Sequence, residues 1–288
     1  MKRTPTTAAL LSLTLMLGFT ACQDESDDLS QSAEPGAEVS VTIVQAEGES
    51  EMESVFELVE DEMAIISESL EGGSVSQREH RILAACATVT HHEENRQVTI
   101  DFGEENCLGK DGLYRRGTIV ISYDGYRHEP GASRTISLQD YYVNDNLLTG
   151  TKTITNATEP EGVPAFHITL TEATYTNARG SVSWSSNRQL QVVEGADTPR
   201  NPFDNKVQVT GNTSGTNRRG VTFSYTVKEP LIRNTEAGCA RTFVDGIIAY
   251  ENENGLSWTL DYDPVGGQPC DRLGAVTIGE KTYPLTLR

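Results

Sequence analysis

The strongest constraint on the fold is a period-two pattern of apolar and polar residues between residues 81 and 288. Side chains of a β-strand point alternately to opposite faces, so this period is typical of strands with one buried and one solvated face. In one segment the apolar members Val221, Phe223, Tyr225 and Val227 alternate with threonine and serine. About thirteen such segments follow one another, and they predict a mainly β protein.

Turn residues separate these segments at short intervals. Gly, Asn, Asp and Pro gather at 144–146, 159–162 and 178–180, where the chain is expected to reverse. Parallel strands need crossover connections of a dozen or more residues, and these loops are too short for that. The sequence therefore predicts a large antiparallel meandering sheet that curls into a barrel, a half-barrel or a sandwich.

One segment with helical periodicity, residues 50–71, precedes the strands. Ser50 and Glu53 have the spacing of a capping box, and Gly72 and Gly73 follow as a stop. The opposite side carries acids and no base, so we expect an amphipathic helix held by its apolar side. Its acidic side is either a solvated surface over the sheet or a contact for a basic partner or divalent cations. The apolar side consists of Met52, Val55, Phe56, Val59, Met63, Ile66 and Leu70.

The net charge of -19 comes from 42 acids and 23 bases. A chain this acidic is repelled by phosphate backbones, which argues against nucleic-acid binding through a basic surface. Seventeen of the acids and one base fall in residues 23–80. The excess charge therefore belongs to an N-terminal arm, and the β-rich part is close to balanced.

The first 21 residues have the features of a signal peptide. Lys2 and Arg3 precede an apolar run of about 14 residues, too short for a membrane-spanning helix of about 20. The four residues that end at Cys22 resemble the lipobox of bacterial lipoproteins, in which such a cysteine is lipidated. We therefore expect residues 1–21 to be removed and Cys22 to anchor the protein to a membrane.

The acids directly after Cys22 resemble the tract that exports lipoproteins of Bacteroidota to the cell surface. The alternative is a solvated linker in a protein that faces the periplasm. We expect residues 22–49 to be an acidic tether and residues 50–288 to form one β-rich domain. The expected location is the outer membrane, lipid-anchored and exposed at the cell surface.

Four further cysteines form an even set in a chain expected to be exported, which favours disulfides. Three pairings are possible. Internal similarity favours Cys86 with Cys107 and Cys239 with Cys270, because Thr-Ile-Asp-Phe precedes Cys107 and Thr-Leu-Asp-Tyr precedes Cys270. Each pair also brackets a hairpin signal. Free thiols or a metal site are the alternatives, although no pair has Cys-x-x-Cys spacing.

Recognisable catalytic motifs are absent from the sequence. There is neither a Gly-x-Ser-x-Gly elbow nor a His-Glu-x-x-His zinc motif. The run 91–94, His-His-Glu-Glu, is interpreted as a hairpin tip, because adjacent strand side chains point apart. Asp261, Asp263 and Asp271 partly match a calcium loop, but Val265 stands where an oxygen ligand belongs. No cofactor is predicted.

Two sets of residues could bind a glycan. A threonine row could present hydroxyls, although threonine is common on solvated strand faces. Aromatic residues could stack on sugars, although strand aromatics are more often core. The row is Thr149, Thr151, Thr153 and Thr155, and the aromatics are Tyr141, Tyr142, Tyr175, Trp184 and Trp258.

The segments 101–107, 109–117, 141–144, 150–156 and 260–271 combine turns, strand faces and cysteines. In these segments the chain resembles a group of β-rich lipoproteins of Bacteroidota with no assigned activity. The resemblance implies a β fold and an envelope location, and it offers no catalytic residues to carry over.

Three functional hypotheses of different class follow. The first is a non-catalytic surface lipoprotein that binds a glycan, a protein or another envelope component. The second is an outer-membrane carrier, a half-barrel closed by the 50–71 helix around a lipid-like ligand. The third is an enzyme without a recognisable motif, which would need a cleft with close carboxylates such as Asp101 or Asp261.

Overall fold

The computed structural model describes residues 86–286, except 111, 127, 198–203, 236–238 and 240–242. The described residues form one sheet of fourteen strands, with a short 3-10 helix, η1 (Glu93–Asn95), between the first two. The helix predicted at 50–71 lies outside this part of the chain. The strands are β1 (Thr88–His92), β2 (Gln97–Asp101), β3 (Cys107–Leu108), β4 (Tyr114–Tyr123), β5 (Ser133–Val143), β6 (Asn146–Asn156), β7 (Ala165–Asn177), β8 (Gly180–Glu194), β9 (Lys206–Thr216), β10 (Thr222–Asn234), β11 (Phe243–Asn252), β12 (Ser257–Asp261), β13 (Leu273–Ile278) and β14 (Lys281–Thr286).

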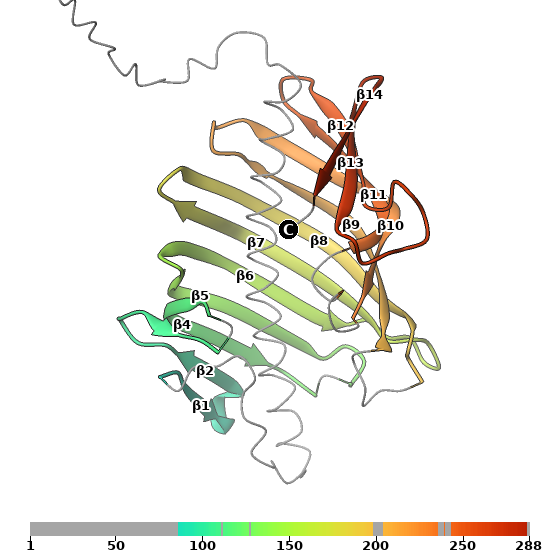
Figure 1. Ribbon diagram of the computed structural model, residues 1–288. Helices are drawn as coiled ribbons and strands as arrows, with labels where there is room; N and C mark the ends of the chain where they lie inside the picture. Colours follow the sequence, from blue (N-terminus) through green and yellow to red (C-terminus); the bar gives the residue numbers. More distant parts are fainter. Residues whose placement is uncertain are drawn as a thin grey trace, which may run out of the picture.

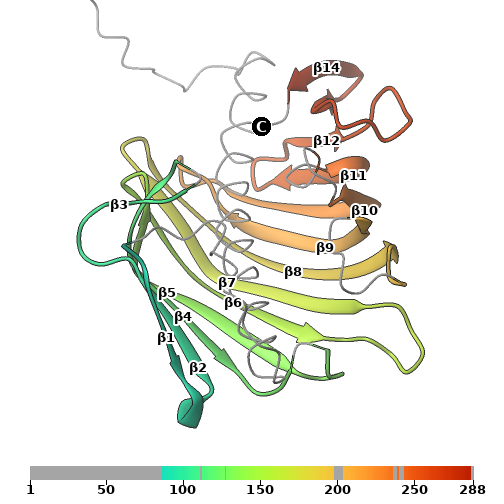
Figure 2. The ribbon, with the colours of Figure 1, turned by 60° about the horizontal axis from the view of Figure 1, so that its bottom comes forward.

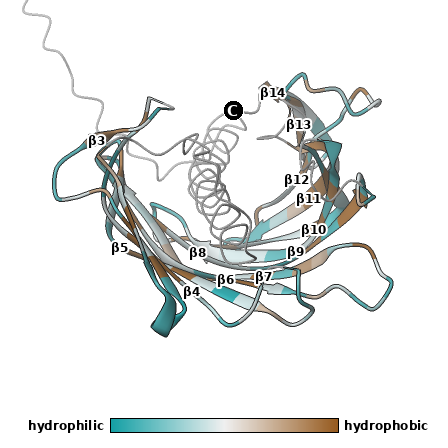
Figure 3. Cartoon of the chain, turned by 90° about the horizontal axis from the view of Figure 1, so that it is seen from below, coloured by the Kyte–Doolittle hydropathy of each residue, from teal (hydrophilic) through white to brown (hydrophobic). Residues whose placement is uncertain are grey.

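The sheet is an antiparallel meander, in which each strand of the main path pairs with its neighbours in sequence (Figure 1). The short strand β3 lies off this path and pairs with β4. β1 and β14 form the two edges, so the sheet is not closed. Figures 2 and 3 show it curling into an open half-barrel, with β4 and β5 in one wall and β11 to β14 in the other. The predicted fold class is confirmed in its half-barrel form.

Bulges in β5 and β7, the two strands on either side of β6, bend the sheet. Asp140 in β5 and Glu172 in β7 have positive φ angles of 46° and 52° at sites where the strand register shifts. Each lies beside a glycine on the adjoining strand: a Cβ on Gly117 would meet the Asp140 carbonyl oxygen at 2.0 Å, and one on Gly150 would meet the Cα of Ala173 at 2.9 Å. A bulge adds one residue to one strand and increases the local bend and twist. Glycine on the partner strand makes room for it.

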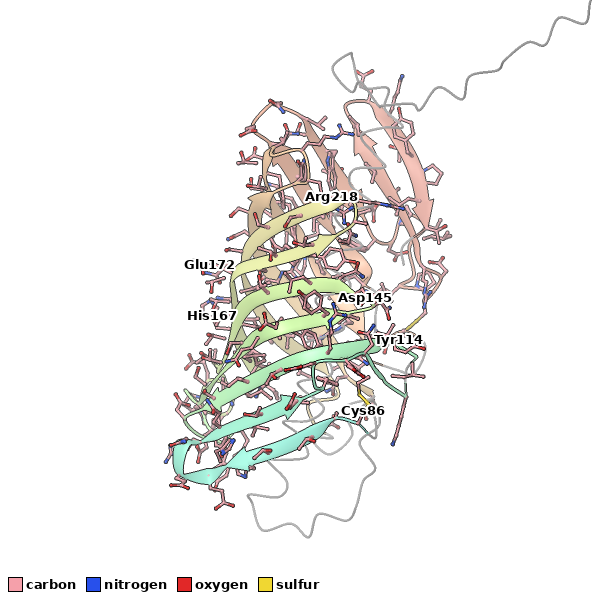
Figure 4. All side chains as sticks on the ribbon, turned by 90° about the vertical axis from the view of Figure 1, so that its left-hand side faces the viewer. Cys86, Tyr114, Asp145, His167, Glu172 and Arg218 are labelled. Carbon is pink, nitrogen blue, oxygen red and sulfur yellow. A yellow bond between two sulfur atoms is a disulfide. The ribbon has the colours of Figure 1, made fainter. Side chains whose placement is uncertain are left out.

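The inner, concave face of the half-barrel carries most of the buried side chains, because apolar residues alternate with polar ones along each strand. Figure 4 shows His167 and Glu172 on the opposite, outer face. The register places directly paired residues in rows across the inner face. The first inner row runs from β1 to β12 as His91, Val98, Ile121, Ile136, Lys152, Leu170, Ser186, Thr213, Tyr225, Tyr250 and Trp258. The second inner row runs from β4 to β9 as Tyr123, Arg134, Ile154, Ile168, Arg188 and Gly211.

Candidate functional site

Two disulfides fasten loops near the two ends of the sheet. Cys86 is bonded to Cys107 with a Cα–Cα distance of 6.0 Å, and Cys239 is bonded to Cys270 with a distance of 5.3 Å. The favoured pairing is therefore confirmed. The first bond ties the chain before β1 to β3, and the second ties the β10–β11 connection to the β12–β13 loop. Cys22, the expected lipidation site, lies outside the described residues.

A polar cluster on the outer face fixes the loop of the first disulfide. The Arg116 guanidinium lies over the Tyr142 ring at 3.8 Å from its centroid and forms an ion pair with Asp145. It also donates a hydrogen bond of 2.9 Å to Asn106 Oδ1. The hydrogen bond from Asn106, together with Arg116, holds the pKa of Asp145 below its ordinary value. This cluster joins the loop before β3 to the β5–β6 turn, and we assign it a structural role.

The side chains of the three candidate calcium ligands accept hydrogen bonds from backbone amides within turns. Asp261 Oδ1 accepts a hydrogen bond from the Asp263 amide at 2.9 Å, and Asp271 Oδ1 accepts one from the Leu273 amide at 2.9 Å. Asp263 Oδ2 accepts from the Gln268 amide at 2.8 Å. Within the described ranges, no three His, Cys, Asp or Glu side chains are grouped so that they could hold a metal ion. These aspartates shape the loop that the second disulfide fastens.

The His-His-Glu-Glu run forms the predicted hairpin tip between β1 and β2, where η1 makes the reversal. His91 Nε2 and Tyr123 Oη share a hydrogen bond of 2.6 Å, and the two rings stack at 6.0 Å. Burial and the nearby Glu93 carboxylate raise the pKa of Tyr123 above its ordinary value. The run is therefore part of the packing of the β1 edge.

On the outer face, hydroxyl side chains of adjacent strands are hydrogen-bonded to each other in pairs. Thr149 and Thr174 share a hydrogen bond of 2.6 Å, and Thr135 and Thr153 share one of 3.3 Å. The predicted threonine row of β6 lies on this face and is half-buried between its neighbours. Such pairs hold the hydroxyl groups in a regular, uncharged array.

A shallow groove of about 570 Å³ lies in this array, over strands β7 to β10. Ser214 and Thr216 of β9 lie in its middle, and Gly215 between them is closely covered, because a Cβ there would be 2.1 Å from the Ser183 carbonyl oxygen. Glu172 lies at the β7 bulge, and its side chain is the carboxylate among the lining residues. We call this feature the outer groove. Its lining is Glu172, Thr174, Ser183, Trp184, Ser185, Ser214, Gly215, Thr216, Thr222 and Phe223.

Comparison with protein-family models, curated proteins and solved structures finds no match to this chain. The described part of the chain holds no helix that is long and apolar enough to cross a membrane.

Aromatic residues of the inner face form a packed group at the β8–β12 side. Tyr250 stacks on Trp258 at 4.4 Å between ring centroids and on Phe223 at 5.8 Å. Burial raises the pKa of Tyr250 above its ordinary value. Trp184 and Trp258 are 5% and 6% exposed. The interpretation of these strand aromatics as core is confirmed, and the exception is Tyr142, which lies under Arg116 on the outer face.

Buried cations are the unexpected feature of the inner face. Arg115, Arg134 and Lys152 are at most 8% exposed. Arg188 donates hydrogen bonds to Tyr225 Oη and, at 3.5 Å, to Thr213 Oγ1. The sequence carried a signal for Lys152, because it stands between two members of the threonine row and so takes the opposite, inward phase. For the outer groove, the sequence held a weaker signal, namely the serines and threonines of the segments that form β7 to β10.

Proposed function

We propose that the protein is a lipid-anchored envelope protein whose half-barrel is a non-catalytic binding module for a glycan, taken up in the outer groove. The observation that carries the proposal is the lining of this groove, with six hydroxyl side chains around one carboxylate. Hydroxyl groups both donate and accept hydrogen bonds, which suits the hydroxyls of a sugar. An open groove on a rigid sheet also accepts an extended polymer more readily than a closed pocket does.

The same lining favours binding over hydrolysis. Glycoside hydrolysis usually employs two carboxyl groups, one on each side of the scissile bond. Glu172 is the one carboxylate among the residues that line the outer groove. Of the lining hydroxyls, that of Thr174 shares a hydrogen bond with Thr149, and that of Thr222 donates a hydrogen bond of 2.7 Å to Glu253 Oε2, a carboxylate outside the lining. The groove has the composition of a recognition surface.

Calorimetric titration with neutral oligosaccharides of glucose, mannose and N-acetylglucosamine tests this function. Ser214→Tyr fills the middle of the groove, and Tyr is well tolerated on a strand. Thr210→Tyr is the matched control, since it places the same side chain on the same strand outside the lining. We expect at least one oligosaccharide series to bind wild type and the control, and binding to be lost in Ser214→Tyr. Absence of heat with every series, or equal loss in both variants, would overturn the proposal.

The membrane anchor has a separate test. Mass spectrometry of the N-terminal peptide of the protein purified from its membrane should find an acylated Cys22, and Cys22→Ala should release the protein into the soluble fraction. Protease treatment of intact cells should degrade the protein if it faces the outside. An unmodified N-terminal peptide would contradict the anchor, and survival of the protein on intact cells would contradict the surface location.

The carrier hypothesis keeps one observation in its favour, the apolar inner face of an open half-barrel. It requires the hollow to hold a lipid-like ligand. Native mass spectrometry of the purified protein distinguishes the two functions, because a carrier retains bound lipid and a groove-binding module does not need it.

A further inference from the structure

The outer groove extends to two hairpin turns at one rim of the sheet. Its lining residues Thr216 and Thr222 are paired and close the β9–β10 hairpin. Its lining residues Thr174 and Ser183 are paired in the β7–β8 hairpin. Because β8 and β9 are neighbours, the two turns lie two strand spacings apart, which is about 10 Å. A ligand in the groove therefore comes close to the side chains of both turns.

Both turns carry arginine in the same geometry. The sequence Asn-x-Arg-Gly recurs at 177–180 and 217–220. In each turn the asparagine Oδ1 accepts a hydrogen bond of 2.9 Å from the arginine amide, and the glycine has a positive φ angle. The backbone of each turn is thus held by its own hydrogen bonds. Arg179 and Arg219 take matching positions, and Arg218 precedes Arg219; we call these three residues the arginine cluster.

The arginine cluster is open to an anionic ligand. Arg218 lies against the first turn, since a Cβ on Gly180 would be 3.8 Å from its Cγ, and its Nε is buried without a hydrogen-bond partner. Among the described residues, none forms an ion pair or a side-chain hydrogen bond with the three guanidinium groups. Glu253, at the place in the β11–β12 turn that matches Arg218, instead accepts a hydrogen bond of 2.7 Å from Thr222. A guanidinium presents its N–H groups as a planar fork that matches the oxygens of an anion.

We propose that the outer groove binds a glycan with an acidic substituent, a sulfate ester or a carboxylate, and that the arginine cluster holds this substituent. The inference rests on the proposed function, because it names the class of glycan that the groove takes up. Glu172, the carboxylate of the lining, lies away from Arg218 (Figure 4). The groove therefore orients the ligand: uncharged parts of the sugar lie over the hydroxyl groups, and the acidic substituent points to the turns.

Calorimetric titration at low salt tests this with the neutral oligosaccharides, their O-sulfated forms and, for glucose and mannose, the corresponding uronates. We expect an acidic form to bind about tenfold more tightly than its neutral parent, as for one charge-assisted contact. This gain should shrink as the salt concentration rises. Comparison of the sulfated forms with the uronates shows which substituent the cluster takes.

Charge-removing variants locate the gain, measured as the ratio of the dissociation constants of the neutral and acidic forms. Arg218→Gln, and Arg179→Gln on the other turn, should reduce this ratio towards one. Arg218→Lys keeps the charge but not the planar fork, and should give an intermediate ratio. Lys228→Gln is the matched control, because it removes an exposed cation of β10 outside the cluster, and it should keep the wild-type ratio.

The outcomes separate this inference from the proposed function. Equal affinity for neutral and acidic forms, or an equal ratio in Arg218→Gln and Lys228→Gln, would overturn the inference and leave glycan binding intact. Lack of binding by every oligosaccharide, neutral or acidic, would overturn both. If acidic forms bound Ser214→Tyr as tightly as wild type, the cluster would bind anions apart from the groove, and the inference would be wrong.

Discussion

Tyr250→Ala is the most direct stability test of the inner face as the core of the protein. Tyr250 is 4% exposed, and its ring lies between Trp258 and Phe223 in stacked arrangements at 4.4 and 5.8 Å. Truncation of a buried aromatic side chain costs about 3 to 5 kcal/mol, which includes the cavity that remains. The two aromatic pairs account for about 1 to 3 kcal/mol of this, at about 0.5 to 1.5 kcal/mol each.

Urea unfolding followed by tryptophan fluorescence measures the effect, because both tryptophans remain in the variant. Thr259→Ala is the control, since Thr259 neighbours Trp258 on β12 but belongs to the opposite phase of the strand and is half-buried. We expect it to cost about 0.5 kcal/mol, as is usual for a surface substitution. If Tyr250→Ala cost less than about 1 kcal/mol, or no more than the control, the inner face would not be a packed core and the account of the fold would be wrong.

Three further predictions concern the β7 bulge, the second disulfide and Asp145 of the polar cluster on the outer face. Glu172→Gly should raise the free energy of unfolding by up to about 1 kcal/mol, because glycine adopts a positive φ without steric cost; Thr171→Gly, beside it, should lower this free energy in the same urea titration. Replacement of Cys239 and Cys270 by alanine should cost about 3 to 4 kcal/mol, since their bond closes a loop of 31 residues, and an unchanged urea midpoint would contradict this. The lowered pKa of Asp145 means that its contribution to stability is present above the unfolded-state pKa and is lost as the pH falls; Asp145→Asn should therefore lose less stability than wild type between neutral and acidic pH.

Short-range signals in the sequence were sufficient for the topology. Alternation of apolar and polar residues defines the strands, and loops too short for crossovers define the antiparallel order. The hairpin at 252–255 and the two disulfides follow from equally local patterns, because each cysteine pair brackets one hairpin. These features depend on residues that are close in sequence.

The curvature could not be predicted in the same way. In β5 the inward phase changes from Ile136 to Tyr141, because Asp140 is an extra residue at a bulge. Glu172 shifts the phase of β7 between Leu170 and Ala173. An aspartate or a glutamate within a strand segment does not by itself indicate that the residue has a positive φ angle. The choice between half-barrel, barrel and sandwich depends on such bends, so it needed the structure.

The candidate site was missed for a related reason. The threonine row of β6 was visible in the sequence because its members alternate within one strand. The outer groove takes its lining from four strands, among them Ser183 of β8 and Ser214 of β9, which are brought together by the register alone. The inward phase of Lys152 could be predicted from its place between two members of the threonine row, whereas its burial could not.

The central claim is that ligands bind to the outer groove while the inner face serves as core. Amide chemical-shift mapping tests it most directly, with isotope-labelled mature protein titrated with the neutral oligosaccharides named above. The account predicts shifts that cluster at outward residues of β7 to β10, around Ser183, Ser214 and Thr222, with little change along the inner rows. Shifts centred on inner-row residues such as Ile136 and Leu170, or no shifts with any of the oligosaccharides, would contradict it.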